Sequence, residues 1–140
     1  LPRKITVRKN QVYFSIPDYI DDKFNKKIDI GKFDINNPCK INVTLKENSV
    51  LDIGGYKIFI EDDRVVVDRS EVFVETNKVG KMFKSSILKG KYELKIYIDN
   101  GIIEVFINDG KYVISNIVYD LKSYVKVNGI EKIEINEMIF

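Results

Sequence analysis

The residue types that most often perform catalysis are scarce in this chain of 140 residues. Histidine, the usual general base and the commonest metal ligand, is absent. Cys39 is the single cysteine, and because no histidine is present to activate it, we interpret it as a structural thiol. A lone cysteine also excludes a disulfide within the chain and fits a reducing compartment. We therefore expect no free-standing enzyme, no metal site and no cofactor.

The charged residues give no sign of a polyanionic partner. The 23 lysines and arginines are interspersed with 21 aspartates and glutamates, and the net charge is only +2. A nucleic-acid-binding domain would concentrate its excess of cations on one face. No apolar run approaches the length of a membrane helix, so neither nucleic acid nor a membrane is expected as a partner. Glu104 stands out as a lone acid in the apolar segment IIEVFI.

Alternation of apolar and polar residues at every second position predicts β-strands along most of the chain. The composition agrees, because alanine is absent while Ile, Val, Tyr, Phe and Thr, which favour strands, are abundant. Negligible helix is expected, and residues 78–90 are the one segment that could hold a short helical turn. The expected strands lie in or near residues 5–8, 11–16, 26–30, 40–46, 50–53, 56–61, 64–68, 72–75, 91–99, 102–108, 111–118, 124–127 and 131–140.

Two turn sequences predict that residues 92–118 form a three-stranded meander. Asn100-Gly101 is a strong signal for a tight hairpin, and Asn108-Asp109-Gly110 fits a second hairpin with glycine in the left-handed conformation. The strand between these turns is apolar on both faces, so we expect both faces to be covered. The residues predicted to be buried are Ile96, Ile98, Ile103, Val105, Phe106 and Ile107.

These elements predict an all-β fold. About a dozen short strands with no repeat and no linker are typical of a two-sheet antiparallel β-sandwich, here of jelly-roll or concanavalin-like type. The length fits one domain, and residues 1–140 are expected to form it.

Three motifs, in the same order along the chain, resemble the C-terminal β-sandwich domain of glycoside hydrolase family 32. Leu1-Pro2-Arg3 resembles the junction with the preceding catalytic propeller. Val67-Asp68-Arg69-Ser70 resembles a strand end in the middle of the family's domain, and Ile98-Asp99 with Glu104-Val105-Phe106 and Asn108-Asp109-Gly110 resembles its signature hairpin. One departure is Asn100-Gly101, which stands where the family often has Arg-Ser.

The resemblance implies a non-catalytic accessory domain, excised from the C-terminus of a longer β-fructofuranosidase. The catalytic motifs of that family are not in this chain, so the propeller preceding Leu1 is the expected partner, and a homodimer is a candidate assembly. The resemblance favours a cytoplasmic sucrose-6-phosphate hydrolase as the parent protein, with an extracellular levanase or inulinase as the alternative. An apolar or aromatic patch left over after packing would fit this role, with Tyr13, Phe14, Tyr19 and Tyr119 as candidates.

The alternative function implied by the resemblance is a fructan-binding module. Sugar recognition uses an aromatic face with converging polar groups, among which the rigid fork of arginine is favoured. Arg69 beside Asp68 is the first candidate, followed by Asp99 and Glu104. The competing interpretations are an Asp–Arg pair that ends a strand, and two acids that cap the strand end or face surface lysines.

Glu104 carries a separate structural expectation. An ionised carboxylate on a covered face needs a donor, because an unpaired buried charge costs several kcal/mol. We predict that Glu104 is partly buried and paired with Arg69, with Lys95 or backbone N–H groups as the other candidates.

Overall fold

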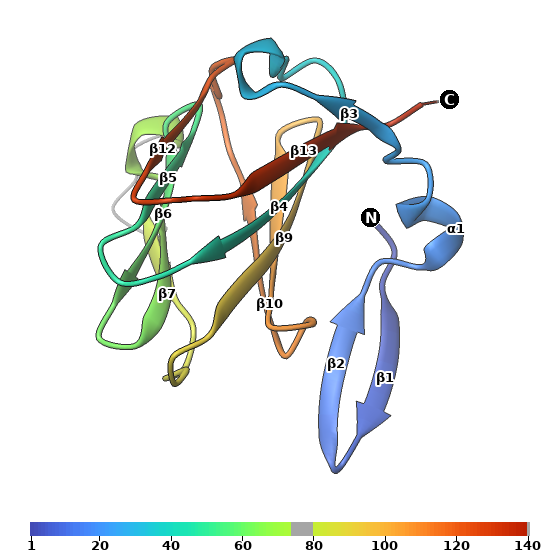
Figure 1. The fold of residues 1–140 in the computed structure, drawn as a ribbon, viewed down its shortest axis with the longest axis vertical. Helices are drawn as coiled ribbons and strands as arrows, with labels where there is room; N and C mark the ends of the chain where they lie inside the picture. Colours follow the sequence, from blue (N-terminus) through green and yellow to red (C-terminus); the bar gives the residue numbers. More distant parts are fainter. Residues whose placement is uncertain (74–79, 140) are drawn as a thin grey trace.

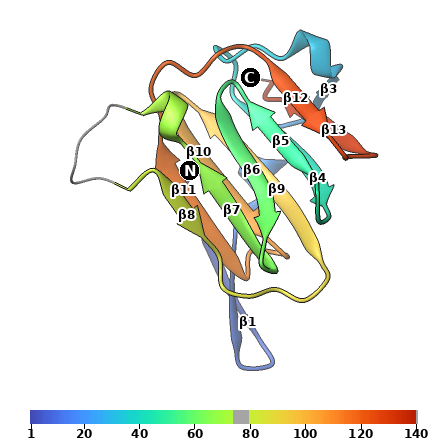
Figure 2. The same ribbon diagram turned by 90° about the vertical axis from the view of Figure 1, so that its left-hand side faces the viewer.

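The computed structural model describes residues 1–73 and 80–139, which form two antiparallel sheets packed face to face and a separate hairpin (Figures 1 and 2). The six-stranded sheet has the order β11 (Tyr112–Ile117), β10 (Ile102–Ile107), β9 (Tyr92–Asp99), β4 (Cys39–Leu45), β13 (Ile133–Glu137) and β3 (Lys26–Ile28). The five-stranded sheet has the order β12 (Val125–Asn128), β5 (Val50–Ile53), β6 (Tyr56–Glu61), β7 (Arg64–Asp68) and β8 (Met82–Lys84). The predicted all-β sandwich is confirmed.

The period-2 pattern forms the core between the sheets. In β4, Ile41, Val43 and Leu45 are buried and point toward the opposite sheet, while the residues between them face outward. The same alternation in β9 and β10 directs Ile96, Ile103 and their neighbours into one continuous core. Burial of such aliphatic side chains, at roughly 1.5–3 kcal/mol each, is the main force that holds the two sheets together.

The meander of residues 92–118 is confirmed. β9 pairs with β10 and β10 with β11, all antiparallel, and the register places Ile103 opposite Ile98. Asn100 and Gly101 form the turn with φ angles of 47° and 80°, as a two-residue hairpin loop requires. All six residues predicted to be buried have exposed fractions of 3% or less.

A second, smaller cluster explains why β10 is apolar on both faces. Phe106 and Tyr97 point away from the main core and contact each other edge to face, with ring centroids 5.5 Å apart. Phe24 packs on Tyr97 at the same centroid distance, and Ile16 completes the buried cluster. The chain segment that leads into the sandwich therefore covers part of the outer face of the six-stranded sheet.

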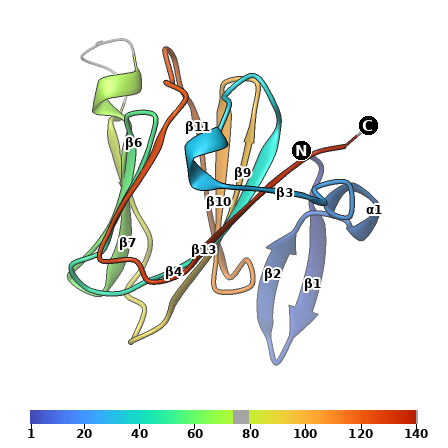
Figure 3. The same ribbon diagram turned by 45° about the horizontal axis from the view of Figure 1, so that its top comes forward.

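The N-terminal hairpin stands outside the sandwich, next to α1 (Asp18–Asp21) (Figures 1 and 3). It consists of β1 (Lys4–Arg8) and β2 (Gln11–Ser15), which pair only with each other. Among the described residues, no helix is long and apolar enough to cross a membrane.

The helical turns are not where the sequence predicted them. Within 78–90, residues 80–90 hold β8 and a loop, because this segment bonds to β7 and the turn before it: β8 pairs with β7, Ser85 N–H donates to Val65 O in β7, and Leu88 N–H donates to Asp63 O in the turn. The short helical elements are α1, η1 (Ile30–Lys32) and η2 (Ser70–Val72). The strand predicted at 72–75 is also wrong at Val72, because this residue ends η2. Residues 74 and 75 lie outside the described residues.

Candidate functional site

Arg69 is buried, and its guanidinium donates hydrogen bonds to backbone carbonyl oxygens. Its side chain is 6% exposed and lies at the end of β7. Nε and Nη2 donate to Gly80 O at 3.0 and 2.8 Å, and Nη1 donates to Ile117 O at 2.9 Å. The guanidinium also lies over the ring of Phe73, 3.6 Å from its centroid. The Arg69 guanidinium, which was a candidate for sugar recognition, thus joins the end of β7 in the five-stranded sheet to the end of β11 in the six-stranded sheet. We call these bonds the Arg69 clamp.

Asp68 and Asp99 are the last residues of β7 and β9. Asp68 Oδ1 accepts a hydrogen bond from Ser70 N–H at 2.9 Å, which is a local turn interaction at the start of η2. Asp99 ends β9 and lies opposite Ile102 in the register. Both aspartates are half-buried.

Glu104 is buried and paired, as predicted, but not with Arg69. Its side chain is 8% exposed and accepts a hydrogen bond from Arg3 Nη2 at 3.0 Å, with the backbone nitrogen of Leu1 at 3.3 Å from the other oxygen. Arg3 also donates to Ser115 Oγ, across the register from Glu104 on β11. The predicted partner is wrong because Arg69 turns toward Gly80 and Ile117, whereas Arg3 enters from the hairpin, 101 positions away in the sequence.

The thiol of Cys39 lies in the core between the sheets and is 1% exposed. Burial, together with the negative charge of Glu137, raises its pKa to about 12. A thiol that stays protonated and out of contact with solvent is not a nucleophile, which agrees with the structural interpretation. Among the described residues there is also no group of three or more His, Cys, Asp or Glu side chains that could hold a metal ion.

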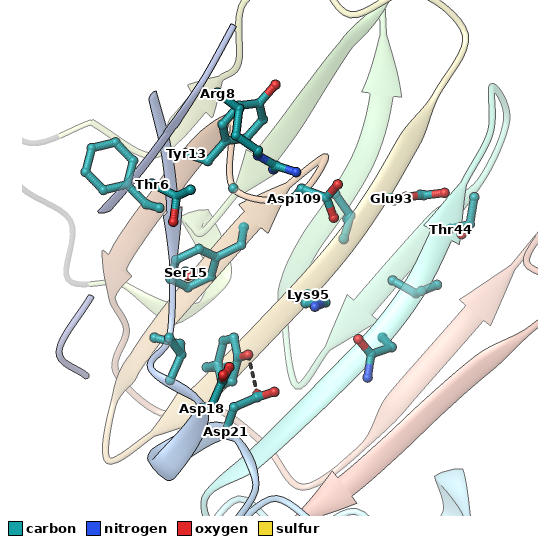
Figure 4. A pocket seen from close by; sticks show the side chains of 18 residues that line it. Thr6, Arg8, Tyr13, Ser15, Asp18, Asp21, Thr44, Glu93, Lys95 and Asp109 are labelled. Carbon is teal, nitrogen blue, oxygen red and sulfur yellow. Dashed lines mark hydrogen bonds between the residues drawn. The ribbon is translucent and has the colours of Figure 1, made fainter. Parts of the chain in front are cut away.

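The described residues also form a cleft that sequence reasoning did not find. It has a volume of about 570 Å³ and lies between the hairpin and the outer face of the six-stranded sheet (Figure 4). One wall is the face of the hairpin that bears Thr6, Tyr13 and Ser15, and the floor comes from the outward residues of β4 and β9. We call it the hairpin cleft.

One end of the hairpin cleft contains a network around Asp21 (Figure 4). Lys40 Nζ donates to both carboxylate oxygens at 2.7 and 2.9 Å, and Tyr97 Oη donates to Oδ1 at 2.6 Å. Burial alone would raise the pKa of Asp21, but these bonds and the charges of Lys40 and Lys95 outweigh it and hold the pKa below its ordinary value. Burial and the bond to Asp21 raise the pKa of Tyr97. Asp21 is therefore ionised and Tyr97 is neutral at physiological pH.

The comparisons with known proteins place this fold in one family. The family described as "Glycosyl hydrolases family 32 C terminal" matches residues 17–135. A search of curated proteins found no match.

Solved structures with this fold include a sucrose-6-phosphate hydrolase from Lactobacillus gasseri, with a TM-score of 0.77 and 16% identity over 98% of this chain and 33% of that chain. The Bombyx mori GH32 beta-fructofuranosidase BmSUC1 has a TM-score of 0.70 and 15% identity, over 97% of this chain and 32% of its own. This chain thus spans about a third of the length of these solved chains. By its family match, which confirms the resemblance seen in its motifs, the chain belongs to the C-terminal family of the family 32 glycosyl hydrolases.

Proposed function

We propose that this chain is the non-catalytic accessory domain of a β-fructofuranosidase-type glycoside hydrolase and stabilises a catalytic propeller that precedes Leu1. The observation that carries the proposal is the family match over residues 17–135. Our first choice of parent is a cytoplasmic sucrose-6-phosphate hydrolase, and an extracellular levanase or inulinase is the alternative. The fold shared with the Lactobacillus gasseri enzyme supports a parent of this class.

Two acids of this chain, Glu104 and Asp21, have structural partners. Retaining glycosidases need two carboxyl groups about 5 Å apart, one of them with a raised pKa. Glu104 is tied to Arg3, and the pKa of Asp21 is lowered, which is the wrong direction for a general acid. Both acids therefore fit a domain whose parent supplies the catalytic groups from elsewhere.

We expect the purified chain to release no fructose from sucrose or sucrose 6-phosphate, while the whole protein encoded by its gene hydrolyses one of them. A coupled assay for free fructose, with both proteins at equal molar concentration, measures this. Release of fructose by the chain alone would overturn the accessory role. A correctly folded whole protein that acts on neither sucrose compound nor on levan or inulin would overturn the proposed parent.

The apolar face of the hairpin is the proposed contact with the catalytic propeller. Ile5, Val7 and Val12 share one face and are 65%, 66% and 41% exposed. An isolated two-stranded hairpin is marginally stable, so an apolar face and the edge of β1 that faces away from β2 suit pairing with a further sheet. Phe14 shares this face but packs on the cluster of Tyr97 and Phe106. Thr6, Tyr13 and Ser15 lie on the opposite face and line the hairpin cleft.

We expect Val7→Lys to destabilise the whole protein but not this chain alone. In the chain, Val7 is mostly exposed, so the change in the free energy of unfolding should stay within about 0.5 kcal/mol. In the whole protein, a charge placed in a buried contact should cost roughly 1.5–3 kcal/mol, the value of burying valine. Val127→Lys is the matched control, because Val127 is exposed on β12 in the five-stranded sheet. Equal effects of the two substitutions in the whole protein, measured by urea unfolding, would contradict the proposed contact.

The alternative, a fructan-binding module that uses Arg69, Asp68, Asp99 and Glu104, stays a prediction. Calorimetric titration with fructose, sucrose and levan tests it. The bonds that Arg69 and Glu104 make within the chain do not favour these two residues as ligand contacts.

A further inference from the structure

The hairpin cleft has walls that the backbone holds in place. Phe14 N–H donates to Gly110 O at 2.9 Å, which fastens β2 to the turn between β10 and β11. A Cβ on Gly110 would overlap the carbonyl oxygen of Phe14, and the residue has a φ angle of +82°, so glycine is required on both counts. At the start of β1, Arg3 joins the hairpin to Glu104 and Ser115. Both anchors lie at the base of the hairpin, where Arg3 precedes β1 and Phe14 is opposite Ile5.

The hairpin wall presents an aromatic ring and hydroxyl groups. Tyr13 is half-buried, and the guanidinium of Arg8 lies 4.1 Å from its ring centroid, which limits the movement of the ring. Thr6 and Ser15 lie on the same face of the hairpin and line the cleft beside Tyr13. Rings that are held rigidly cost little conformational entropy when a ligand stacks on them.

The floor of the cleft carries donors and acceptors side by side. Asn42 on β4 is directly opposite Lys95 on β9, and Thr44 is opposite Glu93. Figure 4 shows Lys95 between the end with Asp18 and Asp21 and the end with Arg8 and Tyr13.

The charges that line the cleft exclude some ligand classes. Its four carboxylates, Asp18, Asp21, Glu93 and Asp109, are balanced by Arg8 and Lys95 in the lining and by Lys40 and Lys91, which pair with Asp21 and Glu93. A phosphorylated ligand or a nucleic acid would therefore find no excess of positive charge there. An apolar ligand would leave the polar groups of the floor without hydrogen bonds, at a cost for each.

We propose that the hairpin cleft binds a neutral oligosaccharide, with one sugar ring against Tyr13 and hydroxyl groups bonded to Asn42, Lys95 and the carboxylates. Sugar hydroxyls both donate and accept, so they can satisfy carboxylates and ammonium groups in the same site. The volume of about 570 Å³ lies within the range of roughly 300–1,000 Å³ that is usual for small-molecule sites. None of the four residues proposed from the sequence as sugar contacts lines this cleft. Binding here does not depend on whether the whole protein hydrolyses fructosides.

The test is a titration of the ¹⁵N-labelled chain, followed by NMR, with nystose and cellotetraose as neutral tetrasaccharides and glucose 6-phosphate as an anionic sugar. At least one tetrasaccharide should shift the backbone amides of β4, β9 and the hairpin, and glucose 6-phosphate should not. The proposal is overturned if neither tetrasaccharide shifts these amides at its highest soluble concentration, or if glucose 6-phosphate binds there as tightly. Because fructose release is not measured, this outcome is independent of the proposed parent activity.

Two substitutions locate the binding within the cleft. Tyr13→Ala removes the stacking ring and should weaken binding about three- to tenfold. Lys95→Met keeps the length of an exposed side chain and removes its donors, so the fold should persist while affinity falls by a similar factor. Tyr19→Ala is the control, because Tyr19 is 71% exposed and does not line the cleft. If Lys95→Met and Tyr13→Ala both fold and bind as tightly as the control, the sugar does not bind in this cleft.

Discussion

Replacing Arg69 with lysine is expected to lower the free energy of unfolding by about 2–4 kcal/mol. Each hydrogen bond to a charged group contributes roughly 1.5–3 kcal/mol, and a lysine ammonium cannot reproduce the planar fork that reaches Gly80 O and Ile117 O together. The substitution also removes the stacking of the guanidinium on Phe73. Urea unfolding followed by circular dichroism measures the change.

The position of Arg69 explains why the expected loss is large. It comes from the end of β7 in the five-stranded sheet, whereas Ile117 ends β11 at the edge of the six-stranded sheet. The side chain is 6% exposed and lies over the ring of Phe73, so the guanidinium that lysine would replace is largely shielded from water.

Arg64→Lys is the matched control for this prediction. Arg64 Nη1 donates one hydrogen bond to Ser85 O at 3.0 Å from a half-buried position within the five-stranded sheet, so its replacement should cost about 1 kcal/mol or less. If both variants lose the same free energy of unfolding, the hydrogen bonds of Arg69 stabilise the domain no more than the single bond of Arg64, and the prediction is wrong.

Replacing Glu104 with glutamine is expected to cost about 1–3 kcal/mol. Glutamine keeps the shape and can still accept a hydrogen bond from Arg3, but the charge that attracts the guanidinium is lost. Arg3 is 35% exposed, and solvent screening of the pair places the expected cost in the lower half of this range. Because the partner belongs to the hairpin segment, the amides of β1 and β2 should also exchange hydrogen faster in this variant.

Glu131→Gln is the matched control for Glu104, because Glu131 also pairs with a cation, Lys46, but is 88% exposed. Its cost should lie near zero. A double-mutant cycle of Glu104→Gln with Arg3→Gln should give a coupling energy well above that of the exposed pair. Equal costs for the two glutamates would contradict the pairing described for Glu104.

In the whole protein, Glu104→Gln should reduce turnover only as far as the loss of stability explains. A variant of unchanged stability that has lost its turnover would instead make Glu104 a ligand contact.

The sequence by itself determined the fold class and the local geometry of the meander. Alternation in β4 and β9 predicts which residues face the core, since side chains in a strand alternate between its two faces. Asn100-Gly101 predicts its own turn because both residues tolerate positive φ angles. Burial of Phe106 on the second face of β10 also followed from the sequence, because no polar residue other than Glu104 interrupts that strand.

Only the tertiary structure decided which of several possible partners each polar side chain meets. Glu104 bonds to Arg3 because the segment that precedes β1 lies beside β10 and β11, and no local pattern relates positions 101 residues apart. Residues 82–84 form β8 because they pair with β7, and this pairing outweighs their local preference. The hairpin cleft arises in the same way, because its wall and its floor come from separate parts of the chain that are joined by the contact between Phe14 and Gly110.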